Sequence, residues 1–173
     1  MAMPVSDLES PSPAVFLQDF VDVDAPERLV SGRLCAGQRW LARLASAAGC
    51  DAEGRLDELG HSRLLITHEV RVRVGRPSRS RTGVVVPLRW EDAEHPGAVP
   101  VLDGNLEVAQ IGPRRSRVVL YASYRPPPAE AIRATEPLDQ ALLQRVAEST
   151  VRSFLCRMAE TLQSWPLEDH TPG

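Results

Sequence analysis

The chain has 173 residues and a mass of 19.0 kDa; 43% of its residues are hydrophobic and 25% are charged. This length and composition are typical of one globular domain, and they exclude a disordered chain, a collagen-like repeat and a coiled-coil rod. The net charge of −3 gives no general attraction to nucleic acid. Apolar runs are only a few residues long, so no segment is expected to span a membrane.

The ends of the chain and its cysteines indicate a cytoplasmic protein. Residues 1–13 are rich in Pro and Ser, lack the basic and apolar regions of a secretory signal, and are predicted to form a flexible arm. We expect residues 14–166 to form a single domain and residues 167–173 a tail. The three cysteines are far apart and include no CxxC pair, which predicts reduced thiols and no metal site. No cofactor-binding motif is present, and none is expected to be needed.

A strand and a helical region are predicted first in chain order. Apolar and polar residues alternate through residues 14–24, as in a half-buried strand. Apolar residues then recur at helical spacing through residues 26–48. Gly32 and Gly37 are expected to break this region into shorter helices, and Gly49 is well placed just after its last turn.

Four later segments alternate between apolar and polar residues and are predicted to be strands: Leu64–Val74, Thr82–Trp90, Val101–Ala109 and Arg117–Arg125. One more strand is expected within Glu53–His61. Pro87 lies inside the second of the four segments, which implies an edge position or a β-bulge. One apolar face per strand, with short turns between strands, is typical of an antiparallel sheet that is buried on one side.

The segment from Leu138 to about Trp165 carries the strongest helical pattern. Its apolar residues form a single stripe: Leu142, Val146, Val151, Phe154, Leu155, Met158 and Leu162. A helix of about 25 residues is on the order of 37 Å long, enough to cross a whole sheet. Phe154 and Met158 lie one turn apart on the stripe, and both are predicted to face the sheet.

The order of these elements resembles that of the START-like, helix-grip proteins (the SRPBCC superfamily). This superfamily includes START lipid-transfer domains, pollen allergens and aromatic-polyketide cyclases. The likeness is carried by the opening segment Phe20–Glu27, by the pair of strands Asp103–Val108 and Ser123–Pro127, and by the closing helix Val146–Leu162. It implies an α+β fold in which a curved antiparallel sheet wraps around a long C-terminal helix.

The resemblance also implies a cavity between the concave face of the sheet and that helix, where an apolar or amphipathic small molecule binds. The residues expected to line it are those of inward parity: His68, Val70, Val86, Trp90, Leu106, Leu120, Tyr124, Phe154 and Met158. The same residues would serve equally well as a filled core.

Three of these residues could give the ligand a polar contact. His68 is a titratable group on an otherwise apolar face, compatible with a satisfied core histidine or with a group that faces a ligand. Trp90 and Tyr124 combine a large apolar body with a polar tip, and plain aromatic core is the alternative for both. Catalytic motifs are missing, so no catalytic residue is assigned.

Basic residues are concentrated in one segment of the chain. All 20 basic residues are arginines, and residues 70–90 hold six of them and no acid, a charge of +6 against −9 for the remainder. Arg76, Arg79 and Arg81 fall in the predicted hairpin loop. They are expected to form an exposed patch with outward Arg71 and Arg73, offset in part by the carboxylates of neighbouring strands, namely Glu69, Asp103 and Glu107.

Such a patch is either a solvated basic face or a contact for an anion. The anion alternatives are a ligand's carboxylate or phosphate, an acidic protein and an anionic membrane surface. A nucleic acid is not expected as partner, because no aromatic stacking platform accompanies the arginines.

The sequence therefore predicts a helix-grip domain that binds a hydrophobic or amphipathic small molecule. Two alternatives stay open: an enzyme of the polyketide cyclase/dehydrase type on the same fold, and a protein–protein interaction module with a filled core. The fold alone does not choose between them, because function depends on the site.

Overall fold

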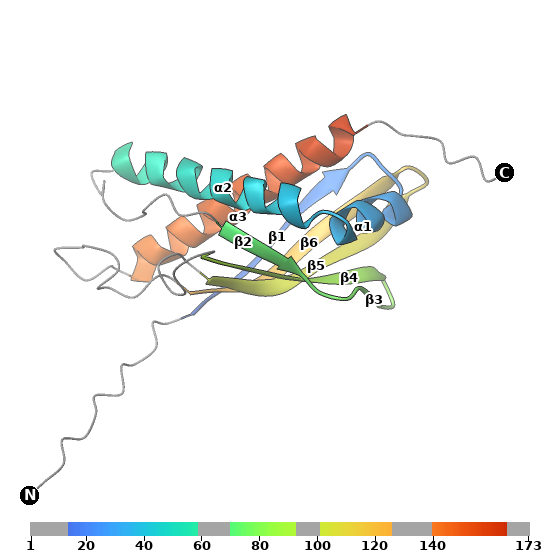
Figure 1. Cartoon of the computed structure of the whole chain (residues 1–173), viewed down its shortest axis with the longest axis horizontal. Coiled ribbons are helices and arrows are strands. Elements are labelled where there is room, and N and C mark those ends of the chain that lie inside the picture. The colour runs from blue at the N-terminus through green and yellow to red at the C-terminus, as the bar shows by residue number, and fades with distance from the viewer. Residues whose placement is uncertain (1–13, 59–69, 93–100, 126–139, 166–173) are drawn as a thin grey trace, which may run out of the picture.

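The structure is a computed structural model that describes residues 14–58, 70–92, 101–125 and 140–165 (Figure 1). Within these ranges the elements in chain order are β1 (Val15–Val23), α1 (Glu27–Cys35), α2 (Gln38–Glu58), β2 (Val70–Val74), β3 (Ser78–Arg79), β4 (Gly83–Asp92), β5 (Val101–Gly112), β6 (Arg115–Arg125) and α3 (Gln140–Ser164). The predicted arm 1–13 and tail 167–173 lie outside the described residues, as does the part of the second predicted strand that precedes β2.

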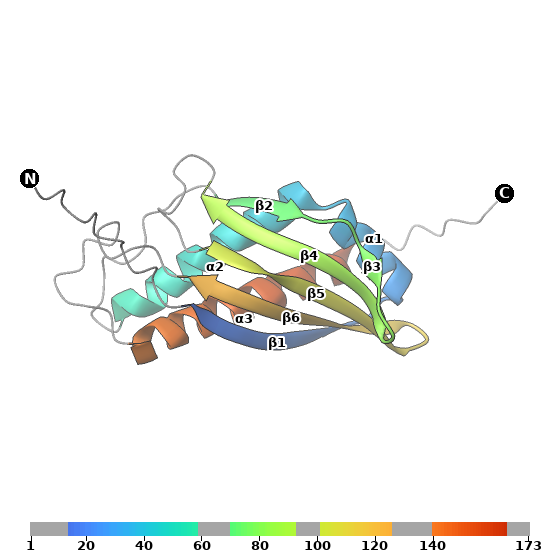
Figure 2. The same ribbon diagram turned by 90° about the horizontal axis from the view of Figure 1, so that it is seen from below.

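The strands form one antiparallel sheet in the order β1-β6-β5-β4-β2, with the short β3 paired to β4 (Figure 2). The residues that alternate between apolar and polar in the sequence also alternate between buried and more exposed in the sheet. On β6, Ser116, Val118, Leu120, Ala122 and Tyr124 are all buried, and the residues between them are half-buried or exposed. One face of the sheet is therefore the core face, as the pattern predicted.

All three helices of the described chain lie on the core face of the curved sheet (Figures 1 and 2). The helix α3 runs beside β1, and α2 lies between α3 and β2. The predicted fold class is confirmed: a curved antiparallel sheet packs against a long C-terminal helix in a helix-grip α+β arrangement. None of the described helices is both long and apolar enough to cross a membrane.

Polar contacts join the helices to one another. The Arg157 guanidinium on α3 grips the Asp51 carboxylate on α2 through two hydrogen bonds of 2.9 and 3.0 Å, and the Ser153 hydroxyl donates to the same carboxylate. Near the C-terminal end of α3, Arg33 of α1 donates to the Leu162 carbonyl oxygen at 2.9 Å. The second half of α3 is thus joined to both α1 and α2 by polar contacts.

The helical region differs from the sequence prediction. The chain does break near Gly37, between α1 and α2, but Gly32 lies inside α1 and Gly49 lies inside α2. A glycine in a helix interior costs about 1 kcal/mol relative to alanine, and packing of α2 against α3 outweighs this cost. The strand expected within Glu53–His61 is also wrong, because residues 53–58 complete α2.

Pro87 lies in β4, which is an interior strand and not an edge. Its carbonyl accepts from the Gly75 N–H at 2.8 Å, on the side where β2 has ended and β3 has not begun. The nitrogen of an antiparallel residue points to the same side as its carbonyl. Because Pro87 has no N–H to return to Gly75, this pair has one hydrogen bond in place of two, and the pairing of β2 with β4 ends at Val74.

Candidate functional site

The residues predicted to line an internal cavity lie in one buried cluster between the sheet and the helices. Seven of the nine are at most 3% exposed: Val86, Trp90, Leu106, Leu120, Tyr124, Phe154 and Met158. Val70 is partly buried and packs against the same cluster. His68 lies outside the described residues. The structure thus brings the eight described residues together on the core side, and their role as a cavity lining stays a prediction.

Phe154 and Met158 face the sheet, which confirms the predicted phase of the closing helix. Both side chains are fully buried. The Phe154 ring meets the Trp90 ring of β4 edge to face, with 4.9 Å between the ring centroids. This geometry is favoured by aromatic pairs, and it joins α3 to the middle of the sheet.

Tyr124 places a polar group inside this apolar core. Its side chain is 2% exposed, and its hydroxyl is hydrogen-bonded to the Thr150 side chain on α3. The Thr150 hydroxyl also donates to the Val146 carbonyl oxygen at 2.8 Å. Burial strongly raises the pKa of the Tyr124 hydroxyl, and the hydrogen bond to Thr150 lowers it in part. The phenol is therefore kept neutral.

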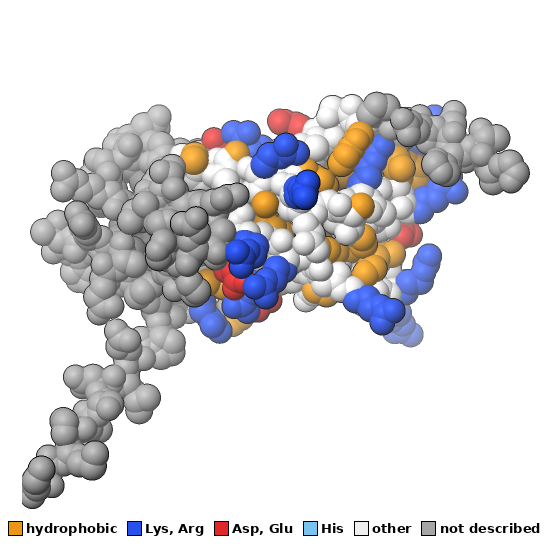
Figure 3. Space-filling model, viewed as in Figure 1, with side chains coloured by type: hydrophobic (Ala, Val, Ile, Leu, Met, Phe, Trp, Pro, Cys, Tyr) orange, Lys and Arg blue, Asp and Glu red, His pale blue; other side chains and the backbone are white. Residues whose placement is uncertain are grey.

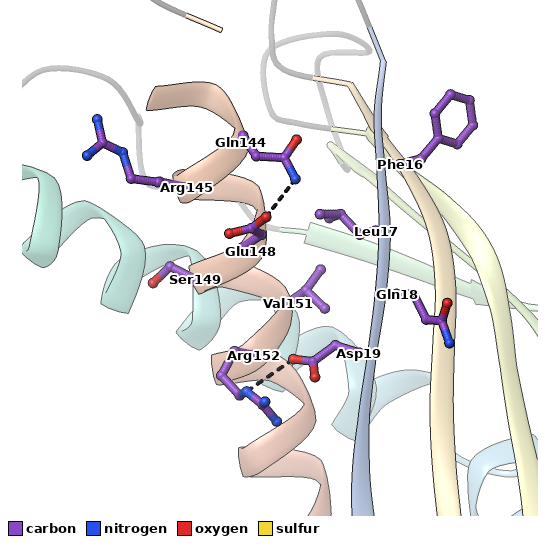
Figure 4. A pocket seen from close by; sticks show the side chains of 10 residues that line it. All are labelled: Phe16, Leu17, Gln18, Asp19, Gln144, Arg145, Glu148, Ser149, Val151 and Arg152. Atoms are coloured by element: carbon purple, nitrogen blue, oxygen red, sulfur yellow. Dashed lines mark hydrogen bonds and ion pairs between the residues drawn. The ribbon is translucent and has the colours of Figure 1, made fainter. Parts of the chain in front are cut away.

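An open groove lies where the edge strand β1 meets the first half of α3 (Figure 4). Its volume is about 470 Å³, within the range of small-molecule sites. The lining residues come from only these two elements: Phe16, Leu17, Gln18, Asp19, Gln144, Arg145, Glu148, Ser149, Val151 and Arg152. We call this the β1–α3 groove.

The groove has an apolar floor with a pair of polar side chains on either side of it. Leu17 and Val151 are buried and form its apolar floor. Gln144 donates to Glu148 at 2.6 Å on one side of this floor, and Asp19 pairs with Arg152 at 3.1 Å on the other (Figure 4). An apolar floor between two polar pairs suits a molecule with an apolar body and hydrogen-bonding groups at its ends.

The charges around the groove are balanced. Asp19 and Arg152 neutralise each other, and the lining contains one further acid, Glu148, and one further base, Arg145. The Arg145 side chain points away from β1 in Figure 4. The groove therefore presents no unpaired cation to an anionic head group, and the exposed Glu148 carboxylate further disfavours such a group.

The sequence did not single out any residue of the groove. The strand parity of Leu17 and the helical spacing of Val151 are those of buried core residues. Gln144 and Glu148 have the spacing of an exposed helix face. These residues come together only because α3 lies beside the edge strand β1. The periodicity of residues within one strand or one helix does not predict which other element lies beside it.

The arginine-rich segment divides into a paired and an unpaired part. On the sheet, Arg73 pairs with Glu91 at 3.0 Å, and Arg89 pairs with Glu91 at 3.4 Å and with Asp103 at 3.2 Å. These contacts offset the like charges of Arg73 and Arg89, which are directly opposite each other in the β2–β4 pair. Arg73 is exposed, as expected for the outward face, and the charge of this part is offset by Asp103, as expected, and also by Glu91.

The three loop arginines behave as predicted. Arg76, Arg79 and Arg81 are exposed, and within the described part of the chain no ion pair joins them to a carboxylate. Glu107, expected to offset charge here, instead accepts hydrogen bonds from the hydroxyls of Ser80 and Thr82. We call residues 76–82 the arginine hairpin.

Several solved structures have a similar overall fold. A hypothetical protein from Helicobacter pylori is 8% identical, with a TM-score of 0.39 over 91% of this chain and 99% of that one. The Zhui aromatase/cyclase from Streptomyces sp. R1128 is 14% identical, with a TM-score of 0.33 over 88% and 98%. Norcoclaurine synthase from Thalictrum flavum is 10% identical, with a TM-score of 0.30 over 88% and 96%.

These likenesses concern the fold alone, since identities and TM-scores this low carry no argument about ligand, activity or site residues. No protein-family model matches the chain, and no curated protein sequence matches it. The helix-grip assignment rests on the strand order and on the position of α3 described above.

Proposed function

We propose that this protein binds an apolar or amphipathic small molecule between the sheet and α3, with the β1–α3 groove as the exposed part of the site. The groove carries the proposal. Its volume of about 470 Å³ is within the range of small-molecule sites, and Leu17 and Val151 give it an apolar floor.

The charge balance of the groove narrows the class of ligand. Asp19 and Arg152 satisfy each other, and Gln144 already donates to Glu148. A ligand with hydroxyl or carbonyl groups exchanges hydrogen bonds with these side chains without leaving a charge unpaired. A strongly anionic molecule finds no such partner. We therefore propose a ligand that is neutral, with an apolar body and one or two polar groups.

The floor of the groove leads into the buried cluster. Val151 belongs both to the groove and to the core, and Phe154 follows it by three residues on α3. A ligand that enters further than the groove would have to displace side chains around Phe154 and Trp90. The predicted lining residues Val86, Leu106, Leu120 and Met158 are the proposed walls of that deeper position.

Probe binding tests the proposal. The purified protein should bind the neutral apolar dye Nile red saturably, and native mass spectrometry should detect any small molecule that co-purifies. Gln144→Trp places an indole in the groove from a half-buried position and should weaken Nile red binding at least about tenfold, a loss of about 1.4 kcal/mol.

Gln163→Trp is the matched control. It introduces the same side chain at an exposed position in the last turn of α3, away from the groove lining, and should leave binding unchanged. Absence of saturable binding would contradict the proposed function. Equal binding by wild type and Gln144→Trp would contradict the groove as the site.

A further inference from the structure

The arginine hairpin projects from one end of the sheet, away from the β1–α3 groove. It consists of β3 and the turn to β4, and it is seen at the right of Figures 1 and 2. Arg76, Arg79 and Arg81 are exposed. In Figure 3 basic side chains stand out from the molecule at the lower right, where Figure 1 labels β3.

The turn of the arginine hairpin is ordered by hydrogen bonds of its hydroxyl and backbone groups. The Ser80 N–H donates to the Gly83 carbonyl oxygen at 2.8 Å, and the Gly83 N–H donates to the Ser80 hydroxyl at 3.1 Å. The Glu107 carboxylate beside the turn accepts hydrogen bonds from the hydroxyls of Thr82 and Ser80. Hydroxyl and backbone groups thus order the turn, and no arginine is used for this purpose within the described residues.

A second turn projects from the same end of the sheet. This β5–β6 turn (Figure 2) carries Arg114, which is exposed, and it follows the end of β5, where the large apolar side chain of Ile111 is 44% exposed. A neighbouring arginine, Arg115, is instead neutralised by Asp22 at 3.2 Å and Asp24 at 3.7 Å. Two separate turns therefore carry arginines that no carboxylate of the described residues neutralises, and an exposed apolar residue lies beside one of them.

We propose that this end of the molecule docks on a membrane surface that contains anionic phospholipids. Arginine forks bind phosphate oxygens through paired hydrogen bonds. A membrane offers such groups across a flat area, so both projecting turns can engage it at once. The exposed Ile111 fits the boundary between head groups and acyl chains. Each basic residue near an anionic surface contributes attraction that salt screens within about 8–10 Å.

The charge distribution of the whole chain supports this orientation. Residues 70–90 carry +6, and the remainder of the chain carries −9. Arg76, Arg79 and Arg81, the part of this positive charge that is unpaired within the described residues, belong to the hairpin, so a membrane of negative potential attracts the hairpin end. This proposal does not depend on the ligand site, because the groove lies on β1 and α3.

Vesicle flotation tests the proposal with the full chain. The protein should float with vesicles of phosphatidylcholine containing about 30 mol% phosphatidylserine, and much less with phosphatidylcholine alone. Binding should weaken steeply as salt is raised from about 50 to 500 mM. The triple variant Arg76→Glu, Arg79→Glu, Arg81→Glu should lower the partition coefficient by on the order of 100-fold.

The control variant changes the net charge equally. Arg39→Glu, Arg43→Glu, Arg125→Glu reverses three exposed arginines outside the two turns, and it should lose far less affinity than the hairpin variant. Ile111→Ser should weaken binding severalfold through loss of apolar insertion. Circular dichroism melts of all variants establish that they are folded before flotation is compared.

Three results would overturn the proposal. The first is equal flotation with neutral and anionic vesicles, and the second is an equal loss in the hairpin and control variants. The third is hairpin-dependent binding of a soluble polyglutamate peptide without any vesicle binding, which would assign the hairpin to an acidic protein partner.

Discussion

Arg152 of α3 and Asp19 of β1 form an ion pair of 3.1 Å at the free edge of the sheet. The pair also satisfies the backbone of the next residue, Phe20: the Phe20 N–H donates to Asp19 at 2.8 Å, and the Phe20 carbonyl accepts from Arg152 at 3.1 Å. Among the described strands, β1 pairs only with β6. The ion pair therefore covers a position at which another strand could add to the sheet.

Removing this pair should make the protein self-associate. In Asp19→Ala or Arg152→Ala, the N–H or the carbonyl of Phe20 loses its partner at the free edge. The stability change should be within about 1 kcal/mol, because the Arg152 side chain is 54% exposed. Light scattering after size-exclusion chromatography should show concentration-dependent oligomers. Arg145→Ala, an exposed arginine of the same helix, should stay as wild type; identical behaviour of all three variants would contradict the edge argument.

Phe154→Ala should be the most destabilising change on α3. The side chain is fully buried, and its ring contacts Trp90 edge to face. Loss of transfer free energy and the cavity left behind should together cost about 3–5 kcal/mol. Urea denaturation measures this cost, and Cys156→Ala, at an exposed position two residues away, should change the free energy of unfolding by less than about 0.5 kcal/mol. A loss below about 1.5 kcal/mol in Phe154→Ala would show that this part of the core is loosely packed.

Tyr124 should resist ionisation until the protein unfolds. Burial raises the pKa of its hydroxyl, so the folded state favours the neutral phenol and the unfolded chain ionises more readily. The resulting stabilisation is complete below the unfolded pKa, about 10, and is lost as pH rises through the folded pKa. The chain has only two tyrosines. Absorbance at alkaline pH should therefore show one of two phenolates appearing together with unfolding.

Tyr124→Phe separates this titration from other alkaline effects. In this variant, no phenolate should appear together with alkaline unfolding. It should also lose about 0.5–1.5 kcal/mol of stability at neutral pH, since the Thr150 hydroxyl loses a hydrogen bond. Tyr121→Phe removes the exposed tyrosine and should keep the late step. Early ionisation of both tyrosines in the folded wild type would contradict the buried position of Tyr124.

Asp22 should contribute to stability above acid pH and lose this contribution on acidification. The Arg117 guanidinium donates to its carboxylate at 2.7 Å and lowers the pKa of Asp22, with Coulombic support from Arg115. A carboxyl group with a lowered pKa stabilises the folded state above its unfolded pKa, about 3.9. That contribution disappears as pH falls through the folded value.

Thermal melts of wild type and Asp22→Asn across the acid range measure this effect. The gap in melting temperature should be largest at neutral pH and should close as pH falls through the lowered pKa of Asp22. In the Arg117→Gln background, Asp22→Asn should leave a smaller gap that varies less with pH, because the main hydrogen-bond donor is gone. A difference in melting temperature that grows towards low pH would contradict the lowered pKa of Asp22.

Most of the sheet could be predicted from the sequence. The alternating segments that became β1, β4, β5 and β6 were correct to within a few residues, and their inward residues, such as Leu106 and Leu120, are fully buried. The closing helix and the inward position of Phe154 and Met158 were also predicted correctly. These features depend on local periodicity, which a linear pattern records directly.

The helical region was harder to predict, because tertiary contacts override local preferences. Gly49 was read as the residue after the last turn, yet α2 continues through it to Glu58. The Asp51 carboxylate, two residues later, accepts hydrogen bonds from Arg157 and Ser153 of α3. Such a contact joins residues about a hundred positions apart, so no local rule reports it.

The sequence by itself determined which residues turn inward, where the long helix lies and where free arginines accumulate, because each is a property of neighbours in the chain. Only the tertiary structure decided that α3 lies beside the edge strand, where Leu17 and Val151 line a groove and Arg152 meets Asp19. It also decided that Arg73 and Arg89 are neutralised, whereas Arg76, Arg79 and Arg81 are not paired within the described chain. The physical reason is that sites form where surfaces of distant elements meet, and their positions follow from packing of the whole core.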